Sequence, residues 1–71
     1  MKFTTRMFIA FNRERLLELR EREAYQSGDF RAYHIPEGGV YQISEWARNA
    51  WTGQDFWQIT DHLTEDEVRS A

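Results

Sequence analysis

A chain of 71 residues without cysteine can build one small core, and it excludes disulfide bonds, thiolate nucleophiles and zinc sites made of cysteine. Nine basic residues against twelve acidic ones give a net charge of -3, which argues against duplex DNA and mildly favours a partner protein with a basic surface. No window reaches the about 18 apolar residues of a membrane span, so we expect a cytoplasmic protein that does not enter a membrane.

The N-terminal segment 3–11, FTTRMFIAF, is predicted to be a strand, because it is rich in β-branched and aromatic residues and alternates in character. Alternate positions place these side chains on one side: Phe3, Thr5, Met7, Ile9 and Phe11. The alternative is a long helix over residues 4–26 with one apolar stripe. That stripe would bury Asn12 and Glu23, so the strand is preferred.

Segment 12–26 consists of strong helix formers, and it is predicted to be a helix that Asn12 caps and Gly28 ends. Two extended segments follow, 30–35 and 40–43. The residues between them, Pro-Glu-Gly-Gly, suit a tight turn, so a β-hairpin is predicted here.

Segment 44–53 holds two of the three tryptophans and is predicted to be a short helix. Ser44 would cap it and Gly53 would end it. At 100° per residue its apolar residues fall on one side, where we expect them to pack in the core: Trp46, Ala47, Ala50 and Trp51.

The C-terminal part is predicted to contain a strand at 56–60, followed by a helix that a capping box at Thr64 and Glu67 opens. The alternative for this part is one helix over residues 55–68, which would place Phe56, Ile59 and Leu63 together.

The predicted fold is a single α+β domain, residues 1–71, with the order β-α-β-β-α-β and a short C-terminal helix. This order is similar to the ferredoxin-like split βαβ arrangement, although no sequence motif accompanies the resemblance. The alternative readings combine into a long N-terminal helix followed by a β-hairpin and two helices.

The sequence carries no motif for catalysis, for a cofactor or for a metal. His34 and His62 are the two histidines, they lie far apart, and no metal-binding spacing surrounds them. Asp61 next to His62 would point to the opposite face of a strand, so the two do not form a base and its orienting partner. We therefore expect a protein that is not an enzyme.

Large apolar side chains are more numerous than one core of this size needs, so some are expected on a partner surface. In the predicted topology the first and last strands are neighbours. One sheet face would then carry an apolar centre with a polar rim, unless the C-terminal helix covers it. The predicted surface consists of Arg6, Phe8, Val40, Gln42, Phe56 and Gln58, with His34 as a possible neighbour.

The predicted function is that of a small protein-binding module, an inhibitor or regulator of the kind that phages and mobile elements encode. One alternative is a binder of single-stranded nucleic acid that uses an open sheet face. The other is a structural subunit of a homo-oligomer, such as a homodimer, in which the surplus rings meet their own copy.

Overall fold

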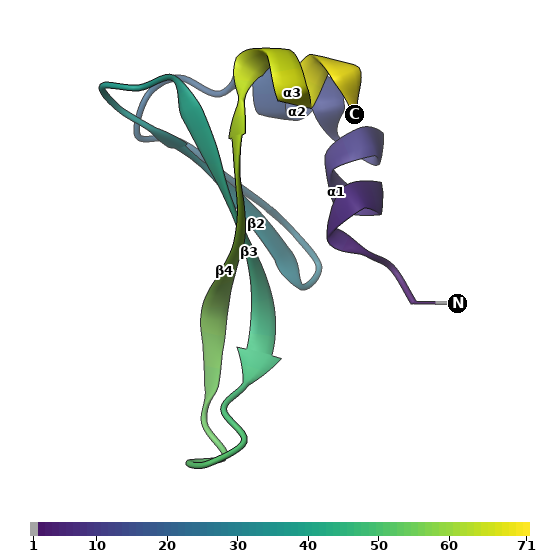
Figure 1. Cartoon of the computed structure of the whole chain (residues 1–71), viewed down its shortest axis with the longest axis vertical. Helices are drawn as coiled ribbons and strands as arrows, with labels where there is room; N and C mark the ends of the chain where they lie inside the picture. The colour runs from purple at the N-terminus through teal and green to yellow at the C-terminus, as the bar shows by residue number, and fades with distance from the viewer. Residues whose placement is uncertain (1) are drawn as a thin grey trace.

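A computed structural model describes residues 2–71 as a four-stranded antiparallel sheet with three short helices (Figure 1). The strands follow one another in the sheet in chain order, β1-β2-β3-β4, so the sheet is a meander without crossovers. The elements in chain order are α1 (Thr5–Phe11), α2 (Arg13–Glu18), β1 (Ala24–Ser27), β2 (Phe30–Ile35), β3 (Val40–Arg48), β4 (Asp55–Thr64) and α3 (Glu65–Ser70).

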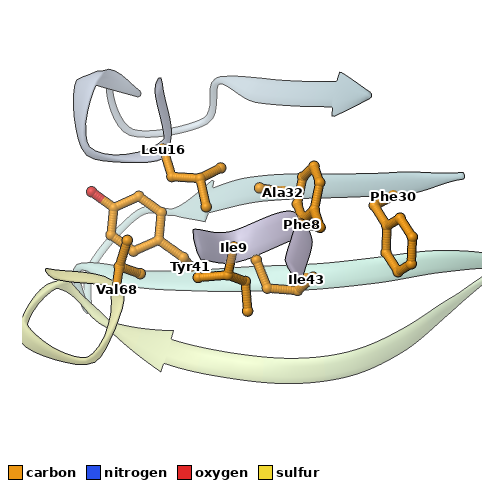
Figure 2. Packing of buried hydrophobic residues seen from close by; sticks show 8 residues of the cluster. All are labelled: Phe8, Ile9, Leu16, Phe30, Ala32, Tyr41, Ile43 and Val68. Atoms are coloured by element: carbon orange, nitrogen blue, oxygen red, sulfur yellow. The ribbon is translucent and has the colours of Figure 1, made fainter. Parts of the chain in front are cut away.

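The three helices lie on one side of the sheet and leave its other face without a covering layer (Figure 1). The core forms between the helices and alternate residues of β2 and β3, whose side chains point toward α1 (Figure 2). Among residues 2–71, no helix is long and apolar enough to cross a membrane. The buried apolar residues are Phe8, Ile9, Leu16, Phe30, Ala32, Tyr41, Ile43 and Val68.

The predicted α+β class is confirmed, but the ferredoxin-like order is not, because the order is α-α-β-β-β-β-α. The strand predicted at residues 3–11 is wrong. Thr4 caps a helix there, with its hydroxyl accepting a hydrogen bond from the Met7 amide at 3.2 Å. Helical spacing places Phe8 and Ile9 together on the sheet, which strand alternation would have separated.

The helix predicted over residues 12–26 is too long, and the alternative helix over 4–26 is longer still. Asn12 interrupts the helical path, since its side-chain amide donates to the Phe8 carbonyl at 2.9 Å. Helix α2 then ends at Glu18, and residues 24–27 form β1. The Tyr25 hydroxyl donates to the Asn12 side chain at 3.0 Å, so tertiary contacts favour the strand over helix propensity.

The predicted hairpin of residues 30–35 and 40–43 is confirmed, with six paired positions between β2 and β3. Its turn contains two residues with positive φ, Glu37 at 72° and Gly39 at 61°. Strand β3, however, continues past Ile43 to Arg48.

The helix predicted at residues 44–53 is therefore wrong, as is the alternative helix over 55–68. Residues 46–48 pair with 55–57 of β4, and Trp46 lies directly opposite Trp57. Cross-strand aromatic pairs of this kind stabilise a sheet, which explains why the segment is extended. The predicted strand at 56–60 is confirmed and extends to Thr64.

The predicted C-terminal capping box is confirmed. The Thr64 hydroxyl accepts from the Glu67 amide at 3.2 Å, and the Glu67 carboxylate accepts from the Thr64 amide at 3.0 Å. Helix α3 packs against α2 through the buried Val68, and Arg13 donates to the Ala71 carbonyl at 2.8 Å. The helix thus lies on the core side and does not cover the other face.

Candidate binding surface

The uncovered side of the sheet, here called the open face, carries alternate residues of all four strands. The register with the buried residues assigns them, because paired residues share a face. Strand β4 contains a bulge at Thr60 that keeps both halves in phase with β3. The larger side chains of the open face are Gln26, Arg31, Tyr33, Ile35, Val40, Gln42, Trp46, Arg48, Asp55, Trp57, Ile59 and His62.

An aromatic pair with a cation above it forms the centre of the open face. The rings of Trp46 and Trp57 meet edge to face with centroids 5.2 Å apart. The Arg31 guanidinium carbon lies 4.5 Å from the centroid of the Trp57 ring, within the range of a cation–π contact. Arg31 reaches this ring from β2 across β3, where the opposing Ser44 is buried. The three side chains therefore hold one another in place on the surface.

The β3–β4 hairpin projects beyond the helices and ends in an ordered loop (Figure 1). The Asn49 side-chain oxygen accepts hydrogen bonds from the amides of Trp51 and Thr52 at 2.8 and 3.1 Å. Gly53 has a φ of 74° and donates to the Asn49 carbonyl. This loop presents Trp51 with 96% of its surface exposed.

The open face is poor in negative charge although the protein is acidic. Among residues 2–71, Asp55 is the one acidic residue of this face by register, and it pairs with Arg48 at 3.1 Å. Arg31 contributes a further positive charge. The acidic residues of α3 lie on the opposite side, so the face is neutral to weakly basic.

The opposite side of the sheet has the polar contacts of a core. His34 stacks on Tyr41 with centroids 4.5 Å apart and donates from Nδ1 to the Leu19 carbonyl at 2.9 Å. Burial raises the pKa of the Tyr41 phenol, and Glu65 raises it further, while Arg69 lowers it. The phenol is therefore neutral near pH 7, as a core position requires.

The six residues of the predicted surface do not come together. Val40 and Gln42 lie on the open face, as strand alternation predicted. Phe56 and Gln58 alternate to the other side, and Phe56 is 41% exposed because the helices do not reach that far along the hairpin. The two from α1 are not on the sheet at all: Arg6 is exposed and Phe8 is fully buried.

Arg6 does line a hollow, an open depression of about 500 Å³ between α1, α3 and the end of β4. Asp61 and Glu67 also line it, with apolar residues between them. Among residues 2–71, no group of three or more histidine, aspartate or glutamate side chains is close enough together to hold a metal ion. His34 and His62 point to opposite faces of the sheet.

Trp46 and Trp51 were predicted in the core, and the prediction of Phe56 and Gln58 on the surface put Trp57 on the core side too. All three tryptophans are instead on the hairpin surface. A strand pattern in the sequence could have found them. Trp46 lies two residues from Ser44 and from Arg48, and Trp57 lies two residues from Asp55 and from Ile59, which is the spacing of one face of a strand. No protein-family model, no curated protein and no solved structure matches this chain.

Proposed function

We propose that this protein is a small non-enzymatic module that binds another protein through the open face and the tip of the β3–β4 hairpin. The observation that carries the proposal is the position of the three tryptophans. They lie along one hairpin that projects past the core, and Trp51 at its tip is 96% exposed. Tryptophan is strongly favoured at the energetic centres of protein interfaces.

The support around these rings fits recognition rather than stability. Trp51 contributes little to the core, yet four hydrogen bonds of Asn49 order the loop that carries it. Arg31 and Trp46 hold the Trp57 ring in one place. A surface ordered before binding loses less conformational entropy when a partner docks, which favours affinity.

The charges of the open face change the expectation, drawn from composition, that the partner has a basic surface. A basic partner would be attracted to the acidic α3, which lies on the other side of the molecule from the open face. We therefore propose a partner surface that is apolar and close to neutral where it meets the hairpin. An inhibitor or regulator of phage or mobile-element type, in the cytoplasm, fits the small size, the acidic charge and the absence of cysteine.

The test compares capture of partner proteins from a native lysate by wild type, by Trp51→Ser and by Phe11→Ser. Phe11 is the matched control, because it is 75% exposed but belongs to α1 on the helical side. We expect Phe11→Ser to retain the wild-type partner and Trp51→Ser to lose it, with melting temperatures unchanged. Equal capture by both variants would contradict the proposal.

A second candidate, a binder of single-stranded nucleic acid, is favoured by the Arg31–Trp57 contact on a face with one acidic residue, itself paired. Bases stack on exposed aromatic rings, and nearby arginines add cation–π and phosphate contacts. Titration with oligothymidylate distinguishes this candidate. Tryptophan quenching that weakens with added salt would support it over a protein partner.

A further inference from the structure

Strand β4 leaves one long edge of the sheet without a partner. Within residues 2–71 it pairs with β3 alone, so the groups on its other side are free. It has ten residues, and its first half, DFWQI, contains no lysine or proline, while its one charged residue, Asp55, is paired with Arg48. Natural proteins protect such edges with charged residues, especially lysine, with proline, with bulges, or with a covering helix or loop. Here the bulge protects the second half, from Thr60 onward.

The hydrogen bonds of β3 reveal which backbone groups of β4 point outward. The Trp46 amide donates to the Asp29 carbonyl at 2.7 Å, so this backbone position faces β2. Its opposite residue Trp57 therefore belongs to a non-hydrogen-bonded pair and directs its own N–H and C=O to the free edge. The Asn49 amide, which donates to the Gln54 carbonyl at 2.8 Å, fits the same alternation. By that alternation the outward groups are those of Asp55, Trp57 and Ile59.

We propose that two copies of this chain pair through β4, antiparallel, about a twofold axis at Trp57. Trp57 would then lie opposite its own counterpart, and Asp55 would lie opposite Ile59 of the second copy. Each of these three pairs consists of two outward-facing residues, so each makes two backbone hydrogen bonds, about six in total. The result is a continuous eight-stranded sheet. This inference does not rest on the proposed function.

The register follows from the bulge, which changes the face that the residues after Thr60 occupy. An axis at Gln58 would place Asp55, on the open face, opposite Asp61 of the other copy, which points to the helical face. An axis at Ile59 would place Trp57, on the open face, opposite Asp61, which the bulge turns to the helical face. The axis at Trp57 avoids both conflicts.

The side chains complement this register. The Trp57 rings would lie next to each other on the open face, each beside its own Trp46, so four indoles would cover one another. Ile59, now 52% exposed, would meet Asp55, whose charge Arg48 already neutralises at 3.1 Å. Phe56 would lie opposite Gln58 of the second copy. The pairing therefore covers exposed apolar groups and buries no unpaired charge.

Sedimentation of the full chain over a concentration series tests the pairing. We expect the wild-type mass to rise to twice that of the monomer. Ile59→Pro should remain a folded monomer by circular dichroism, because proline removes an amide proton that points outward at the edge. Trp57→Lys is the second variant if the proline disturbs folding, and it should also be monomeric. A monomeric wild type, or a dimer that survives Trp57→Lys, would overturn the proposal.

Cross-linking tests the register, since the native chain has no cysteine. Directly opposed strand residues lie within disulfide reach, so Trp57→Cys should form a covalent dimer on mild oxidation. Ile59→Cys should not, because four residues of offset separate the two sulfur atoms by about 14 Å. Faster cross-linking of Ile59→Cys than of Trp57→Cys would refute the twofold axis at Trp57.

Discussion

Replacing Phe8 with alanine should lower the free energy of unfolding by about 3 to 5 kcal/mol, the usual cost of emptying a buried aromatic site. The Phe8 ring is fully buried and lies between two other rings. Its centroid is 5.4 Å from that of Phe30 and 6.3 Å from that of Tyr25. A protein of this length has a total stability of roughly 4 to 11 kcal/mol. The loss is a large fraction of that total, so we expect urea denaturation followed by circular dichroism to show a midpoint far below that of the wild type.

The matched control is Phe11→Ala in the same helix. Phe11 is 75% exposed and stacks on Phe3, which is itself partly exposed, so its removal should cost less than about 1 kcal/mol. A Phe8→Ala variant that melts like Phe11→Ala would mean that α1 does not pack on the sheet in this way.

The second large effect concerns the two isoleucines in the middle of β3 and β4. Ile43 is fully buried under α1, whereas Ile59 is 52% exposed on the open face of the adjacent strand. Ile43→Ala should cost about 2 to 5 kcal/mol, because it removes apolar area and leaves a cavity. Ile59→Ala, the same change on the other face, should cost less than about 1.5 kcal/mol.

Each kcal/mol shifts the melting temperature of a domain this size by roughly 4 to 8 °C, so thermal denaturation of dilute samples separates the two variants. Low concentration matters, because pairing through β4 would add stability that Ile59→Ala could remove. If Ile59→Ala were less stable than Ile43→Ala, the core would lie on the face of the sheet described here as open.

The parts of the fold that the sequence predicted are those with local chemistry. The β2–β3 hairpin follows from its Pro-Glu-Gly-Gly turn, and the start of α3 follows from the Thr64 and Glu67 side chains that bond each other's backbone. Both depend on residues within a few positions of one another, and in this structure the tertiary contacts agree with them.

The N-terminal prediction failed because two periods fit the same residues. FTTRMFIAF alternates like a strand, yet helical spacing also joins Phe8 and Ile9. Distant partners favour the helix, since from α1 the Phe8 ring packs against both Phe30 and Tyr25. Residues 24–27 likewise leave the predicted helix because β2 pairs with them.

The helix prediction for the tryptophan segment failed for the same reason, and this error changed the predicted site more. Residues 44–53 have a helical apolar side and plausible helix ends, but Trp46 and Ala47 find cross-strand partners in Trp57 and Phe56. Once the helix is replaced by a hairpin, the rings move from the core to the surface. Val40 and Gln42 of the predicted site do lie on the open face, because their strand was predicted correctly. Phe8 does not, because its segment is a helix and its ring is buried.

The central claim, that the tryptophans belong to the surface, is tested most directly by their intrinsic fluorescence in a dilute sample of the wild-type monomer. Trp51 is 96% and Trp46 43% exposed, and Trp57 lies on the open face. We expect emission close to that of tryptophan in water for Trp51, and quenching of most of the signal by acrylamide without unfolding. A blue-shifted emission that acrylamide reaches only after denaturation would show that the rings are buried, and it would contradict this account.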